Sequence, residues 1–267
     1  MEKSIILNHH AASLLSYYVD PEKGLHFILE QKDPGYKPPY FDKGLNFIGG
    51  NWKKGVNKDK SPKELVRREI EEEFWRRDEP IEYLNELLGE KFLKTEVIKE
   101  KAKYEGDDKP LQRINLVGKI LEDGAIYTTD YIVKIPPRIT KNTLTYGLTA
   151  FINKLSKEEF ETIETIINDY NGELTTDNKN HKSKIVSVTL DEINGINGNT
   201  KKFAWGYGLI LNDLIKSYIN PSSIGVIRPI NLIKVKKIKY PAEAETTESG
   251  CPTFKGLESI GFVYKTS

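Results

Sequence analysis

The chain has 267 residues, of which 38% are hydrophobic and 30% are charged. This balance fits a folded globular protein with one large core or two modest ones, and it excludes a disordered chain. The 40 basic and 39 acidic residues leave a formal net charge of +1, so no global field attracts nucleic acid or an anionic membrane. A polyanionic partner would have to be held by local contacts.

The cysteine content and the N-terminal segment indicate the cellular compartment. The single cysteine, Cys251, excludes an intramolecular disulfide framework and a zinc site built on several cysteines. The first residues carry no basic lead and no long apolar core, so they do not fit a signal peptide. No stretch approaches the roughly 20 apolar residues that span a bilayer. We therefore expect a cytoplasmic protein without a membrane partner.

The first expected element is a β-hairpin. Two apolar stretches at 13–20 and 25–31 flank the turn signal PEKG at 21–24. The segment 33–44 that follows is dense in proline, glycine and aromatic residues, which prevents regular structure. Its three rings, which either stack on a ligand or close over the core, are Tyr36, Tyr40 and Phe41.

A short strand at 45–50, LNFIGG, is expected to end in a glycine pair, and a well-marked helix start follows it. Ser61 fits the N-cap, Pro62 fits the first helical position, and Glu64 completes a Ser-x-x-Glu capping box. The helix is predicted to end near Arg77, because Asp78 and Glu79 lead into a proline that disfavours helical backbone before it.

The rest of the chain is predicted mainly as strand, with three further helices. The predicted segments are helices at 80–92, 156–170 and 201–218, and strands at 94–104, 113–121, 125–137, 184–193 and 230–240. We expect one domain over residues 1–219. Residues 220–267 are expected to form a C-terminal extension packed on that domain.

Three carboxylates share one side of the helix that begins at Ser61. On a helix that turns about 100° per residue, Glu69, Glu72 and Glu73 fall within a sector of roughly 100°. Like charges at this spacing repel, so a neutralising cation would stabilise the arrangement. Glu73 projects between Val66 and Ile70, close to the face that should be buried, where a carboxylate needs a metal, an arginine or several hydrogen bonds.

Carboxylate oxygens without histidine or cysteine favour Mg²⁺, or Mn²⁺ in its place, over zinc. Such ions usually serve phosphate groups. The alternative from spacing alone is a glutamate-rich surface helix in a shifted register. The four histidines show no metal-ligand or triad spacing, and no histidine role is predicted.

The strand, glycine pair, Ser-Pro cap and acidic helix together resemble the Nudix box. That pattern is Gly, five residues, Glu, seven residues, Arg-Glu, an apolar residue, any residue, Glu-Glu, any residue, Gly and an apolar residue. The residues that match its central part in order are Arg68, Glu69, Ile70, Glu72 and Glu73.

The chain departs from the box on both sides of that centre. Lys60 stands where the first Glu is expected, while Trp75 and Arg76 occupy the glycine and apolar positions downstream. The glycines lie about four residues too far upstream, which a loop insertion within 51–60 would explain. With that insertion, Gly49-Gly50 keeps the position of the family's glycine pair.

The resemblance implies an α/β (α+β) fold, an α/β/α sandwich around a mixed β-sheet, with the substrate's diphosphate over the box helix. It implies that Glu69, Glu72 and Glu73 bind Mg²⁺ or Mn²⁺, that Arg68 pairs with a box carboxylate, and that a carbonyl near Gly50 adds a ligand. The implied reaction is attack by a metal-activated water on a diphosphate.

The resemblance leaves the base open between a box glutamate, here Glu69, and a distant loop acid, for which Glu122 and Glu173 are candidates. It also places residues that contact a nucleoside in the loop before the glycine strand, where Tyr36, Tyr40 and Phe41 lie. The implied activity is that of a pyrophosphohydrolase on a nucleoside diphosphate derivative.

Several alternatives stay open. The altered box residues favour a Nudix-fold module that binds a nucleotide-like ligand without turnover, and an accidental match would leave an interaction domain. The basic strand at 230–240 could neutralise RNA phosphates, although solvated lysines on a sheet edge explain it more simply. The segment 205–207, WGY, either approaches a ligand or packs the late helix on the sheet. A homodimer is also open.

Overall fold

The sheet and its covering helices lie within the part of the chain that the computed structural model describes. These residues are 4–6, 9–36, 39–52, 59–74, 109–135, 144–169, 183–195, 201–219, 233–235, 253–255 and 263–266. The predicted helix at 80–92, the predicted strand at 94–104 and the centre of the predicted loop insertion, 53–58, lie outside them.

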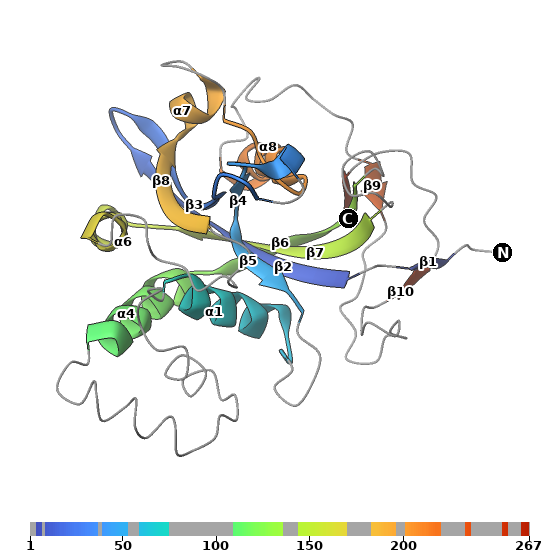
Figure 1. Cartoon of the computed structure of the whole chain (residues 1–267), viewed down its shortest axis with the longest axis horizontal. Helices are drawn as coiled ribbons and strands as arrows, with labels where there is room; N and C mark the ends of the chain where they lie inside the picture. The colour runs from blue at the N-terminus through green and yellow to red at the C-terminus, as the bar shows by residue number, and fades with distance from the viewer. Residues whose placement is uncertain are drawn as a thin grey trace.

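A mixed sheet forms the centre of the molecule (Figure 1). Its strands are β2 (His9–Asp20), β3 (Gly24–Lys32), β4 (Leu45–Asn46), β5 (Ile48–Asn51), β6 (Ile126–Ile135), β7 (Leu144–Lys154), β8 (Ser183–Thr189), β9 (Ile233–Val235) and β11 (Val263–Thr266). They run in the order β4-β3-β2-β7-β6-β11-β9, with β5 also paired to β2 and β8 to β3. The expected hairpin is β2 and β3, which pair antiparallel. A separate two-stranded sheet joins β1 (Ser4–Ile6) to β10 (Thr253–Lys255).

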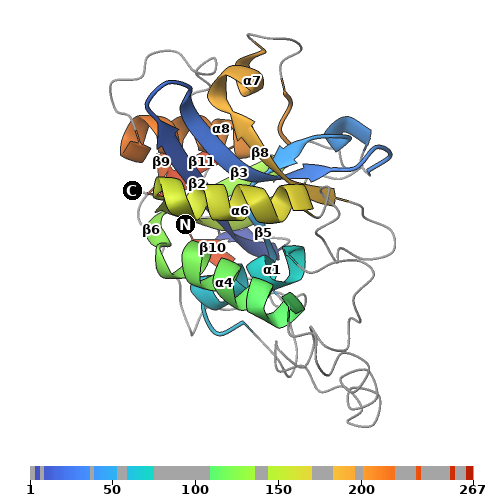
Figure 2. The same ribbon diagram turned by 90° about the vertical axis from the view of Figure 1, so that its left-hand side faces the viewer.

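Helices cover both faces of this sheet (Figure 2), which confirms the predicted sandwich. One core lies under α1 (Pro62–Glu73), α4 (Lys109–Asp123) and α6 (Lys157–Asp169). The other lies under α7 (Leu190–Asn194), α8 (Tyr207–Leu214), a π-helical turn at Ile215–Ile219 and the 3-10 turn η1 (Pro39–Phe41). No helix of the described residues is long and apolar enough to cross a membrane.

The sheet forks beside β2. Residues Ala11–Leu14 of β2 pair with β5, whereas Ser16–Asp20 pair with β3. The end of β3 therefore leaves β2 and pairs with β4 instead, at Glu30 and Gln31. Between β4 and β5 stands only Phe47, so the strands on the two sides of the fork stay close together.

The segment 113–121 was predicted as a strand, and this prediction is wrong. It lies within α4, where Val117 and Leu121 are fully buried four residues apart, the spacing of one helix face. The β-branched and leucine residues favoured strand, but packing against α1 prevails over propensity. The buried Arg113 Nε donates to the carbonyl of Phe74 at 3.0 Å, which caps the end of α1.

Other elements also differ from the prediction. The strand predicted at 184–193 ends at Thr189, which caps α7, so residues 190–193 are helical. The central strand β7 was not predicted, although its residues are almost continuously buried, as expected of a strand covered on both faces. The late helix begins at Tyr207 rather than at 201, because Trp205 and Gly206 take left-handed backbone angles with φ of 51° and 84°. The segment before it lies beside β4, where Ala204 donates its amide to the carbonyl of Leu45 at 3.0 Å.

Two neighbouring histidines open β2. The ring of His9 stacks on Tyr146 at 4.8 Å, and His10 Nε2 lies 3.1 Å from the hydroxyl of Thr149, which donates to Asp130 at 2.6 Å. Burial lowers the pKa of His9 to about 4. Burial and the neighbouring His9 lower the pKa of His10 to about 3. Both rings are therefore neutral at pH 7.

These histidines predict a loss of stability in mild acid. The unfolded chain takes up protons on both rings as pH falls through about 6.5, whereas the folded chain does not until about 4 and about 3. The unfolded state thus binds more protons, and the free energy of unfolding falls by about 2 kcal/mol per buried histidine between pH 7 and 5. Urea unfolding at the two pH values measures this, and His10→Gln should make the fall smaller. An unchanged fall in His10→Gln would contradict the assignment.

Candidate functional site

The centre of the candidate site is the contact between β5 and α1. A Cβ added to Gly50 would lie 2.3 Å from both the carboxyl carbon and one carboxyl oxygen of Glu69. The Glu69 carboxylate is thus seated directly against the backbone of Gly50, in space that only glycine leaves open. A Cβ on Gly49 would come within 2.3 Å of the Ala12 carbonyl oxygen, so the close approach of β5 to β2 requires the first glycine as well.

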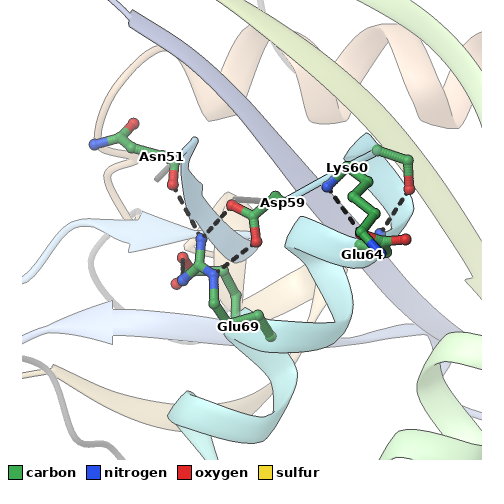
Figure 3. Close-up of polar contacts among 7 residues, drawn as sticks. Asn51, Asp59, Lys60, Glu64 and Glu69 are labelled. Carbon is green, nitrogen blue, oxygen red and sulfur yellow. Dashed lines mark hydrogen bonds and ion pairs between the residues drawn. The ribbon is translucent and has the colours of Figure 1, made fainter. Parts of the chain in front are cut away.

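Arg68 holds this contact together. Its Nε and Nη2 donate to the two carboxylate oxygens of Asp59 at 2.9 and 3.0 Å, and Nη2 also donates to the Asn51 carbonyl at 3.1 Å (Figure 3). Its Nη1 donates to Glu69. One buried guanidinium therefore ties the loop before α1 and the end of β5 to the carboxylate, in the forked geometry that favours arginine over lysine.

The sequence did not single out Asp59. Lys60 stands at the position where the resemblance expects a glutamate, and the preceding aspartate supplies the carboxylate that pairs with Arg68. The backbone amide of Lys60 donates to Glu64 at 2.8 Å, and the amide of Glu64 donates to the Ser61 hydroxyl at 3.1 Å. The predicted N-cap at Ser61 is confirmed, whereas Glu64 bonds the amide one residue before the N-cap, so the capping box is not complete as predicted. An acidic residue next to the expected position was the available signal.

Arg68 and its neighbour Arg67 make a matched pair for a stability experiment. The Arg68 side chain is 8% exposed and that of Arg67 is 58% exposed. Arg68→Met should lower the free energy of unfolding by about 3–5 kcal/mol, because it leaves the buried Asp59 carboxylate without its cation. Arg67→Met should cost clearly less, because the Arg67 end of its pairs with Glu71 and Glu122 is exposed to solvent. Equal losses in urea unfolding would refute this difference.

The other acids of α1 divide into two groups. Glu73 is buried, one turn after Glu69 on the same side of the helix. Glu71 pairs with Arg67 instead, at 3.0 Å. The side chain of Glu72 lies outside the described residues, so its predicted position beside the other two acids is not compared. Within the described ranges, no group of three or more His, Cys, Asp or Glu side chains is arranged to hold a metal ion.

A buried ion pair borders the site on β3. The ammonium of Lys32 donates to one carboxylate oxygen of Glu30. The other oxygen accepts a hydrogen bond from the side-chain amide of Asn46 at 3.3 Å. Burial opposes the charge on Lys32, but the carboxylates of Glu30 and Glu73 and the Tyr36 hydroxyl raise the pKa of Lys32 overall. This pair was not predicted. A Glu-x-Lys pattern at the end of an otherwise apolar strand, two residues apart and therefore on one face, was the signal for it.

The three aromatic residues predicted either to stack on a ligand or to close over the core differ in burial and in their contacts. Phe41 is 2% exposed and packs on Trp205 with ring centroids 4.4 Å apart, so packing accounts for it. Tyr36 is partly buried and has the Lys32 ammonium 5.1 Å from its ring centre. The side chain of Tyr40 lies outside the described residues.

Tyr207, at the start of α8, extends toward the fork of the sheet. Its ring packs on Phe47 at 4.7 Å. Burial raises the pKa of Tyr207, a hydrogen bond with Ser13 lowers it, and the charges of Glu30 and Glu69 raise it further. The hydroxyl therefore remains protonated at pH 7.

The proposed loop acids receive little support. Glu122 lies in the last turn of α4 rather than in a loop, and its carboxylate is 3.7 Å from Arg67. Glu173 lies outside the described residues.

The fold of the chain is similar to those of two solved Nudix hydrolases. RenU, a Nudix hydrolase from M. smegmatis, overlaps 72% of this chain and 83% of its own at a TM-score of 0.30 and 10% identity. A Nudix hydrolase from Alicyclobacillus acidocaldarius overlaps 83% of this chain and 99% of its own at a TM-score of 0.39 and 13% identity. No protein-family profile and no curated protein matches the sequence.

Proposed function

We propose that the chain is a metal-dependent pyrophosphohydrolase that cleaves the diphosphate linkage of a small nucleoside diphosphate derivative in the cytoplasm. The observation that carries the proposal is the Glu69 carboxylate, seated on the backbone of Gly50 and held by Arg68. Close packing on Gly50 and the bond from Arg68 restrict the position of the carboxylate, which is what positioning of a reacting group requires.

The residues at this seat fit Mg²⁺ or Mn²⁺. Carboxylate oxygens of Glu69 and Glu73, with Glu72 and the Gly50 carbonyl, are the hard donors that these ions prefer. When bound, the ion would lower the pKa of a water and offset charge on the diphosphate oxygens. Arg68 donates to one oxygen of Glu69, and both oxygens of a carboxylate are acceptors. In this proposal the second oxygen accepts the proton of the attacking water.

A non-catalytic nucleotide-binding module is the second candidate. One observation favours it: an oxygen of Glu69 already accepts a hydrogen bond from Arg68, which competes with a metal ion for that carboxylate. In that case Lys32 and the aromatic residues would hold the ligand and the acids would have a structural role.

The test is turnover of nucleoside diphosphate derivatives, dinucleotides and nucleoside triphosphates, with Mg²⁺, Mn²⁺ or EDTA, read by release of phosphate-containing products. Metal-dependent cleavage of one class supports the hydrolase. Silence across the panel, together with no Mn²⁺ binding by calorimetry, would refute it. Nucleotide binding without turnover would support the module.

A further inference from the structure

Trp205 occupies an unusual backbone conformation next to the site. Its φ of 51° lies in the left-handed region, which bulky residues rarely adopt. Gly206 follows at φ 84°, and the Trp205 carbonyl accepts a hydrogen bond from the Tyr146 hydroxyl. Strained residues of this kind persist where the surroundings hold them, and they concentrate at ligand-binding positions.

Because of this turn in the backbone, the side chains of Trp205 and Tyr207 contact different parts of the protein. The Tyr207 ring packs on Phe47, three residues before Gly50 in the chain. The Trp205 indole instead packs on Phe41 and stays partly exposed. Phe41 is almost completely buried, so it supports the indole and has no surface left for a ligand.

Backbone contacts connect the indole's surroundings to Lys32. The Lys32 ammonium lies over the Tyr36 ring, and the Lys32 backbone amide donates to the carbonyl of Gly44, which lies against Ala204 next to Trp205. Tyr36 and Trp205 pack against the same core, on the α8 side of the sheet. A ligand whose diphosphate meets the carboxylates and Lys32 would therefore carry its next group toward partly exposed aromatic rings.

We propose that Trp205, supported by Phe41, is the stacking surface for the base of the nucleoside diphosphate derivative, and is a residue that determines specificity. The proposal rests on the proposed function, because it places the diphosphate at Glu69. Indole offers a large flat surface that stacks on any base, so Trp205 selects substrates that contain a base over diphosphates that lack one.

Two non-hydrolysable probes test this by calorimetry on the full chain with Mg²⁺: adenosine 5′-(α,β-methylene)diphosphate, which has a base, and methylenediphosphonate, which has none. The variant is Trp205→Asn, because asparagine tolerates left-handed backbone while lacking the ring. Its affinity for the probe with a base should fall about 10- to 100-fold, the range of one base–aromatic stack. Its affinity for the probe without a base should not change. Trp205→Phe should restore part of the loss.

Lys43→Asn is the matched control, since Lys43 is the other described non-glycine residue in this conformation, at φ 55°. It should leave the ratio of the two affinities unchanged. Equal weakening of both probes by Trp205→Asn, no weakening of either, or failure of the wild type to bind the probe with a base would overturn the proposal. A wild type that turns over no diphosphate, yet binds the adenosine probe through Trp205, would refute the hydrolase and leave the stacking role intact.

Discussion

Replacing Glu69 with glutamine is expected to lower kcat for the diphosphate substrate by at least about 100-fold, the upper end of the loss when a residue that merely supports a metal ligand is removed. Glutamine keeps the shape of the side chain but removes the negative charge and one acceptor oxygen. The bond from Arg68 then meets a neutral group, and the site loses both a metal donor and its candidate base. Turnover at saturating Mg²⁺ and Mn²⁺ binding by calorimetry are the measurements.

Glu71→Gln is the control for that experiment. Glu71 lies on the same helix and is about as buried as Glu69, but its partner is Arg67 on another side. It should keep wild-type turnover, while Glu73→Gln should lose it as Glu69→Gln does. If Glu71→Gln were as inactive as Glu69→Gln, the loss would reflect damage to α1 and the assignment of Glu69 would fail.

Gly50→Ala is the second large effect that we expect. The added methyl would stand 2.3 to 2.5 Å from three atoms of the Glu69 carboxyl group, so either the side chain must leave its seat or β5 must shift. Overpacking of this kind costs about 1–3 kcal/mol of stability. Turnover should fall to the level of Glu69→Gln, although no charged group has been removed. Steady-state kinetics and urea unfolding measure the two effects.

Two further variants make that prediction specific. Gly118→Ala adds the same methyl inside α4, where no atom lies within 4 Å, and it should stabilise the chain by about 0.5–1 kcal/mol with unchanged turnover. The double variant Gly50→Ala with Glu69→Gln should be no less active than either single variant, because both act on one contact. Additive losses would show that Gly50 acts through something other than Glu69.

The parts of the fold that the sequence predicted are those with strong local signals. The cap at Ser61 and Glu64 predicted the start of α1, and the turn signal at 21–24 predicted the hairpin of β2 and β3. Local signals failed where tertiary packing decides. The residues of α4 favour strand by composition, and only their burial against α1 shows the helical spacing of Val117 and Leu121.

The candidate site shows the same division. Glu69 and Glu73 share a side of one helix, so spacing alone grouped them, and the resemblance to the Nudix box added Arg68. Glu30 and Lys32 lie on β3 and Tyr207 lies on α8, and only the pairing of β3 with β4 and the packing of Tyr207 on Phe47 bring them together beside β5. Asp59 was obscured by Lys60, because a pattern with fixed spacing does not allow for a carboxylate one position early.

The position of β2 in the sheet has a consequence for folding. Its contacts with β3 and β5 join parts of the chain that are near in sequence, so the seat of Glu69 on Gly50 needs only short loops to close. Its parallel pairing with β7 joins distant parts of the chain. The side chains of His10 and Thr149, which hydrogen-bond across the two strands, are 139 residues apart. Closing so long a loop is slow, because the entropy is lost before the contacts compensate for it. The candidate catalytic contact should therefore be protected from hydrogen exchange earlier in refolding than the centre of the sheet.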